Sequence, residues 1–167
     1  MEGDVVTSFR ESMEIQAPPE VVWALVTDIP RHVEFAGQKS ITKEIDFDRE
    51  VAVGERWVAH ERFGPQKFDA PSEITAVEPG RRLEWVSYPP MKDANRGAGG
   101  RVTWGYELTP SPRGTTLVHY MTVLEPRRGA TALKLMYAAF RLPAKQVAGG
   151  RTTLENIRRA AESGGTP

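Results

Sequence analysis

The sequence predicts an α+β domain: a curved antiparallel sheet of seven strands wrapped around one long C-terminal helix. Two short helices are expected between the first and second strands. Three observations support this. One alternating segment comes before two prolines, six period-two segments follow between Gly/Pro turns, and the period becomes helical after Gly129. Seven antiparallel strands must curl, and the last helix is the only long amphipathic element available to cover the concave side.

The first strand and the two short helices occupy the N-terminal part of the chain. Residues 7–15 alternate between apolar and polar side chains, which indicates a half-buried strand. Pro18 and Pro19 fit the start of a helix, because proline lacks the N–H that the first turn leaves unpaired. Asp28 can cap a second short helix that begins at Pro30.

Six further strands are expected between Ser40 and Pro126. Their boundaries are set by short turns rich in glycine and proline, a spacing typical of an antiparallel meander. The strand candidates are residues 41–48, 54–64, 66–79, 81–89, 100–110 and 115–126. The linker 89–100 contains two prolines and three glycines, and we expect it to be mobile.

The C-terminal segment has the period of an amphipathic helix. Pro143 interrupts this helix and should kink it or split it in two, and Gly149-Gly150 should make it less regular. We expect a single domain over residues 1–162 and a disordered tail over residues 163–167. The apolar stripe of the helix consists of Leu133, Met136, Tyr137, Phe140, Val147, Leu154 and Ile157.

Composition narrows the possible partners. Lysine plus arginine equals aspartate plus glutamate at 22 each, so no basic excess favours nucleic acid as a partner. The chain has no cysteine, and no apolar run approaches the roughly 18 residues of a membrane span. No signal peptide is visible in residues 1–12. We therefore expect a soluble, cytoplasmic protein without an integral membrane segment, present as a monomer or homodimer.

Alternation along the strands assigns side chains to a concave side that could enclose a small hydrophobic ligand. A wall of aromatic and methionine side chains with a few polar groups is typical of a small-molecule cavity. The same pattern also fits ordinary core packing, so the cavity depends on the whole set. The candidate ligand-binding residues are Trp57, Phe63, Phe68, Trp85, Trp104, Tyr106, His119, Met121, Met136, Tyr137 and Phe140.

Three of the expected inward residues could take part in proton transfer. His119 could move a proton near neutral pH, or it could be a neutral core histidine held by a hydrogen bond. Glu61 could have a raised pKa and act as a base, pair with Arg101, or lie in water at the mouth. Tyr106 is the third catalytic candidate, and His60 is expected on the convex side.

Established motifs for metal, phosphate and serine chemistry are missing. No two of the three histidines have metal-ligand spacing, and neither H-E-x-x-H nor G-x-S-x-G occurs. The segment "GQKS" at 37–40 lacks the rest of a phosphate-binding loop, and no dinucleotide fingerprint is present. The sequence therefore predicts no metal site and no cofactor.

Several motifs, in order, resemble the SRPBCC superfamily, also called START-like or helix-grip proteins, and in particular its polyketide cyclase/dehydrase and lipid-transport group. They are "IQAPPEVVWALVTD" (15–28), "GERW" (54–57), "ITAVEPGRRLEW" (74–85), "GGRVTWGYELTPSPRGTTLVHY" (99–120) and "TLENIRRAAE" (153–162). The resemblance implies a helix-grip fold with an apolar cavity between sheet and helix. It suggests binding of a lipid- or polyketide-like molecule. An aromatase/cyclase-type enzyme and a protein-interaction or stress-associated domain are the alternatives.

Overall fold

The computed structural model describes residues 4–63, 65–88, 100–125 and 129–164. It contains the strands β1 (Val5–Ile15), β2 (Arg56–Phe63), β3 (Gln66–Glu78), β4 (Arg82–Ser87), β5 (Arg101–Ser111) and β6 (Gly114–Leu124). The helices are α1 (Pro19–Thr27), α2 (His32–Phe35), α3 (Ala130–Ala139) and α4 (Leu142–Glu162), with 3₁₀ turns η1 (Ile29–Arg31) and η2 (Gly37–Lys39). No helix among these residues is long and apolar enough to cross a membrane.

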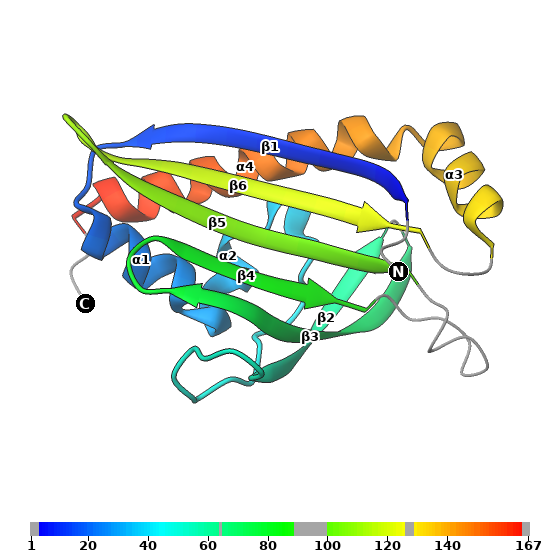
Figure 1. The fold of residues 1–167 in the computed structure, drawn as a ribbon, viewed down its shortest axis with the longest axis horizontal. Helices are drawn as coiled ribbons and strands as arrows, with labels where there is room; N and C mark the ends of the chain where they lie inside the picture. The colour runs from blue at the N-terminus through cyan, green and yellow to red at the C-terminus, as the bar shows by residue number, and fades with distance from the viewer. Residues whose placement is uncertain (1–3, 64, 89–99, 126–128, 165–167) are drawn as a thin grey trace.

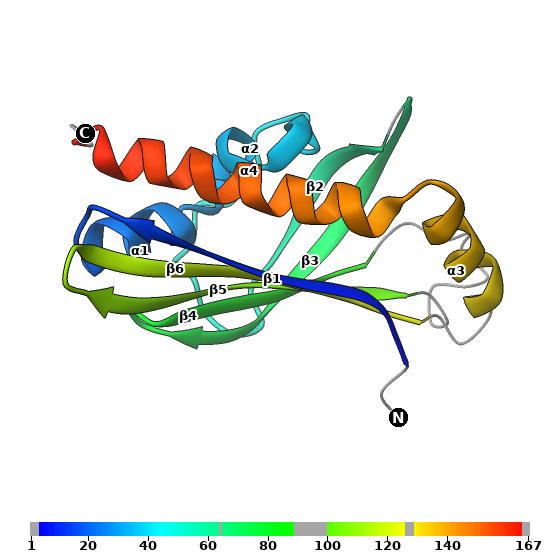
Figure 2. The ribbon, with the colours of Figure 1, turned by 90° about the horizontal axis from the view of Figure 1, so that it is seen from above.

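The strands form one antiparallel sheet in the order β1-β6-β5-β4-β3-β2 (Figure 1). Helix α4 lies along one side of this sheet, with α1 and α2 near its C-terminal end and α3 beyond its other end (Figure 2). The main core packs side chains of the sheet against α1, α2 and α4, and includes Ile15, Val22, Ile74, Leu117 and Ile157. The predicted α+β class and the helix gripped by the sheet are confirmed.

The turn from β1 into α1 forms as the two prolines predict. Pro18 is the N-cap of α1 in an extended conformation, and Pro19 is its first residue. The second short helical segment begins at Ile29, one residue before Pro30, as the turn η1 that leads directly into α2. The chain can therefore reverse at the end of β1 without leaving a buried N–H unpaired.

The expected strand over residues 41–48 is wrong, and the described sheet has six strands rather than seven. Only Ile41 forms an isolated bridge, with Glu61 at the free edge of β2. Ile45 and Phe47 are buried and Asp46 is exposed. The period-two pattern is thus real, but it reflects an extended segment packed on the core without a partner strand.

The C-terminal helix is split, as Pro143 predicts, although the break comes before this proline. Arg141 adopts a left-handed conformation, with φ of 51°, between α3 and α4. Pro143 lies in the first turn of α4, where a missing N–H costs little. The linker expected to be mobile and the end of the predicted tail lie outside the described residues, at 89–99 and 165–167.

Candidate functional site

Aromatic rings from neighbouring strands contact one another on the concave side of the sheet. Register aligns Trp85 of β4 with Trp104 of β5, and Tyr106 of β5 with His119 of β6. The His119 ring stacks on Tyr106 with 4.6 Å between centroids, and on Trp104 with 5.9 Å. Trp85 lies 5.6 Å from Tyr106. These distances correspond to direct ring contact, so the predicted inward orientation of these side chains is confirmed.

His119 is a buried, neutral imidazole with a defined tautomer. Its Nδ1 lies 3.0 Å from the carbonyl oxygen of Gly105. A carbonyl only accepts hydrogen bonds, so Nδ1 carries the proton and Nε2 has a free lone pair. Burial, and to a smaller extent nearby His32, lowers the pKa of His119 to about 4 against the opposing effect of this hydrogen bond. His119 therefore stays uncharged at neutral pH.

His32 of α2 is a second buried histidine in the same cluster, and sequence analysis did not assign it to the site. Its Nε2 donates to the carbonyl oxygen of Val26 at 2.8 Å. Its ring centroid lies 5.4 Å from that of Trp85 and 6.1 Å from that of Tyr106. Burial lowers the pKa of His32, although this hydrogen bond opposes the shift. A helix of four residues has no periodic pattern, so no sequence signal pointed to this position.

The Tyr106 ring contacts both of these histidines. The residue is 3 % exposed, and its hydroxyl makes no hydrogen bond to another described residue. Burial raises the pKa of Tyr106, so the hydroxyl stays protonated. A hydroxyl without a protein partner on a nearly buried residue is a group that a ligand atom or a water molecule can satisfy.

Glu61 lies on the concave side at the other end of the sheet, near the turn between β2 and β3. It lies on the same side of β2 as buried Trp57 and Ala59, and it pairs in register with Phe68 of β3. Glu61 is half-buried, and it forms neither the suggested ion pair with Arg101 nor a hydrogen bond from its carboxyl group to any described residue. Burial raises the pKa of Glu61 to about 7.

The other predicted ligand-binding residues divide into three groups. Trp57 and Met121 are buried, while Phe68, Trp104 and Tyr137 are half-buried. The side chain of Phe63 lies outside the described part of the chain. The inward orientation expected for Met136 and Phe140 is wrong, because they are 40 % and 57 % exposed. The break at Arg141 makes α3 a separate helix, so the apolar stripe does not continue through it.

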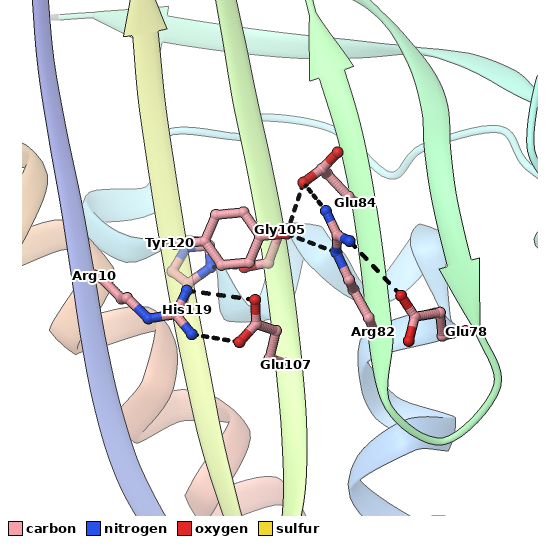
Figure 3. A network of polar contacts seen from close by, with 8 residues as sticks. All are labelled: Arg10, Glu78, Arg82, Glu84, Gly105, Glu107, His119 and Tyr120. Carbon is pink, nitrogen blue, oxygen red and sulfur yellow. Dashed lines mark hydrogen bonds and ion pairs between the residues drawn. The ribbon is translucent and has the colours of Figure 1, made fainter. Parts of the chain in front are cut away.

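The convex side of the sheet carries a polar network (Figure 3). Tyr120 donates to Glu84 at 2.8 Å, Arg82 donates to the same carboxylate at 2.7 Å, and Arg10 pairs with Glu107. Partial burial of Glu84 would raise its pKa, but these hydrogen bonds outweigh that effect and lower it. His60 also lies on this side, as predicted, with Nδ1 2.6 Å from Asp69.

Gly105 separates this network from the aromatic cluster. A Cβ at this position would lie 2.2 Å from Cζ of Tyr120, so the tyrosine ring lies directly on the glycine. The carbonyl oxygen of the same glycine accepts the hydrogen bond from His119 (Figure 3). One residue without a side chain thus permits close packing on the convex side and fixes the tautomer of a histidine on the other side.

Two hollows are found, and neither is lined by Tyr106, His119 or Glu61. One, of about 470 Å³, is lined by residues from both sides of β2 and β3 and by Tyr88, namely Arg56, Trp57, Val58, Pro71, Ser72, Glu73 and Tyr88. The other, of about 190 Å³, lies between α2 and the end of α4. The internal cavity therefore stays a prediction. In the part of the chain that the structure describes, no group of three or more His, Asp or Glu side chains could hold a metal ion.

Comparison with known proteins places this fold and its motifs in a family. A protein from Mycobacterium tuberculosis called "Uncharacterized protein Rv0088" is 28 % identical over 101 residues, which cover 60 % of this chain and 41 % of that protein. The chain thus spans less than half the length of this relative.

Solved structures share the fold. Protein MLL2253 from Mesorhizobium loti has a TM-score of 0.66 and 21 % identity, covering 93 % of this chain and 97 % of that one. The di-domain ARO/CYC StfQ from the steffimycin biosynthetic pathway has a TM-score of 0.69 and 14 % identity, covering 95 % of this chain and 51 % of that one. The family described as polyketide cyclase/dehydrase and lipid transport matches residues 6–162, and the chain belongs to this family.

Proposed function

We propose that the protein binds an apolar or aromatic small molecule, lipid-like or polyketide-like, between the concave side of the sheet and helix α4. The observation that carries this proposal is the hydroxyl of Tyr106, a residue only 3 % exposed within the aromatic cluster, which has no hydrogen-bond partner among the described residues. Family membership supports the same class of ligand. Burial of a ligand's apolar surface would drive binding at roughly 25 cal/mol per Å² before the costs of association.

The four tryptophans allow a direct test of where a ligand binds. Trp57, Trp85 and Trp104 are on the concave side, whereas Trp23 is in α1. Each indole N–H gives a separate NMR signal, which Trp→Phe substitutions assign. We expect titration with fluorene, an apolar aromatic probe, to shift the signals of Trp85 and Trp104. If fluorene shifts neither signal and is not retained in equilibrium dialysis, the proposal is wrong.

A second candidate function is an aromatase/cyclase-type enzyme. The observation that favours it is the presence of two neutral imidazoles, His32 and His119, that both contact the Tyr106 ring. The free lone pair of His119 could accept a proton from an activated methylene group while the Tyr106 hydroxyl donates a hydrogen bond to the adjoining carbonyl. The likeness to StfQ, at 14 % identity, shows the fold alone.

Turnover separates the two candidates. A poly-β-ketone thioester incubated with the enzyme should give an aromatic product faster than it does without protein, as measured by mass spectrometry. His119→Gln should abolish this acceleration and leave fluorene binding intact, because the neutral side chain keeps a hydrogen-bond donor for Gly105. A binding protein without turnover would show no acceleration in either form.

A further inference from the structure

Glu61 differs from Glu11 and from the serines on the concave side because its acid group has no partner among the described residues. Arg151 of α4 donates to Glu11 at 2.9 Å, and the hydroxyl groups of Ser72 and Ser87 pair with each other at 2.8 Å. The carboxyl group of Glu61 makes no hydrogen bond or ion pair with any described residue. A half-buried carboxyl group without a partner loses part of its hydration and gains nothing from the protein in return.

The surroundings of Glu61 on the concave side are apolar. Its register partner is Phe68, its bridge partner is Ile41, and the next inward pair along the two strands is Ala59 with Ala70. The two alanines are small, so the inner surface beside the carboxyl group has less side-chain volume than the aromatic rows further along the sheet.

The charged neighbours of Glu61 on β2 and β3 do not share its side of the sheet. Alternation along β2 and β3 places these side chains on the convex side, where His60 and Asp69 pair with each other. The segment before β2 contacts Glu61 through Ile41, and Lys39 and Lys43, two residues before and after Ile41, are exposed. The charged groups on the convex side are His60, Arg62, Lys67 and Asp69, and the two exposed lysines are Lys39 and Lys43.

From this geometry we infer that Glu61 recognises a carbonyl oxygen of the ligand by donating a hydrogen bond from its protonated carboxyl group. The inference rests on the proposed function and adds a chemical class, an aromatic ketone or related carbonyl compound, together with a pH limit. Burial raises the pKa of Glu61 to about 7, so the donor is present below neutral pH. Above this pH the ionised carboxylate can only accept hydrogen bonds, and it repels a carbonyl oxygen.

Fluorene and 9-fluorenone provide matched probes, since they share one ring system and differ by a carbonyl oxygen that does not titrate. We expect the dissociation constant of fluorenone to rise about tenfold between pH 5.5 and pH 8.5, the effect of losing one hydrogen bond to a charged repulsion. The dissociation constant of fluorene should not change over this range. Equilibrium dialysis measures both probes under the same conditions.

Two variants of Glu61 test the assignment. Glu61→Gln keeps an N–H donor at every pH, so it should bind fluorenone with an affinity that no longer depends on pH. Glu61→Leu should bind fluorenone no better than fluorene. A pH step that persists in Glu61→Gln, or a wild-type affinity for fluorenone that is constant with pH, overturns the inference. Failure of both probes to bind at any pH overturns the proposed function instead.

Discussion

Helix α4 contains two adjacent glycines, and only one of them occupies a position where an added methyl group has no room. A Cβ at Gly150 would lie 2.6 Å and 2.7 Å from the Cε2 and Cζ atoms of Phe9, whereas a Cβ at Gly149 would meet nothing within 4 Å. Phe9 is 7 % exposed, and its ring makes edge contacts with Trp104 and His119. The ring therefore cannot swing aside without disturbing the aromatic cluster, and we expect the two alanine substitutions to have opposite effects.

The magnitudes follow from two contributions. Replacing a mid-helix glycine by alanine stabilises a helix by about 0.5–1 kcal/mol, and this is the whole effect expected for Gly149→Ala. Gly150→Ala gains the same amount but also overpacks the core, at a cost of about 1–3 kcal/mol. The free energies of unfolding of the two variants should thus differ by about 1–3 kcal/mol, with Gly150→Ala the less stable. Urea unfolding followed by circular dichroism measures this difference.

A third substitution identifies the cause of the difference. Phe9→Leu removes the ring atoms that the new methyl group would meet, so Gly150→Ala should cost less in the Phe9→Leu background than in the wild-type protein. Equal stabilities of Gly149→Ala and Gly150→Ala would refute the close approach of α4 to β1. A penalty for Gly150→Ala that is unchanged by Phe9→Leu would show that the clash involves another group.

Two further predictions concern side chains on either side of the sheet. Tyr106→Phe should leave the free energy of unfolding unchanged, because the hydroxyl has no protein partner, whereas Tyr120→Phe should lower it by about 1–2 kcal/mol through loss of its hydrogen bonds to Glu84 and Arg82. Equal losses in urea unfolding would contradict this. The pKa of His119 falls from 6.5 in the unfolded chain to about 4, so its contribution to stability is complete above pH 6.5 and is lost as the pH falls towards 4. The raised pKa of Glu61, about 7, acts in the opposite direction, because it makes the folded protein more stable as the pH falls from 7 to 4.5. In the wild-type protein this gain partly offsets the stability lost at His119. Glu61→Gln removes the offset, so its free energy of unfolding should fall by about 3 kcal/mol on acidification, more than that of the wild-type protein. An identical pH profile of stability in both proteins would argue against this compensation.

Alternation predicted the sheet well where strands have partners on both edges. The pattern predicts a strand over residues 115–126, and in β6 every second residue is buried, including Leu117, His119, Met121 and Val123. The same signal failed at residues 41–48, because an extended segment packed on the core alternates in burial whether or not its backbone pairs. The pattern of apolar and polar residues therefore does not reveal whether the backbone of a segment pairs with a neighbouring strand.

The helical part was predictable only in outline. Pro143 indicated a break, but the structure places it at Arg141, whose left-handed conformation no residue preference indicates. A shift of this kind changes the phase of the helix, which is why Met136 and Phe140 face outward although their spacing continues the stripe of α4. His32 was missed for a related reason, since its place beside Tyr106 depends on how the short helices pack rather than on local sequence.

The partners of the polar groups separate the scaffold from the site on the concave side. Nδ1 of His119 and the carboxylate of Glu11 are satisfied within the protein, so these two contacts can be explained by stability alone. Tyr106 and Glu61 are not, and they lie at opposite ends of this side, one beside His32 of α2 and the other near the turn between β2 and β3. A ligand that satisfies both must be long and must carry an oxygen near each end, as a lipid-like or polyketide-like chain does, and we expect such a chain to lose affinity in Tyr106→Phe and in Glu61→Leu by independent amounts.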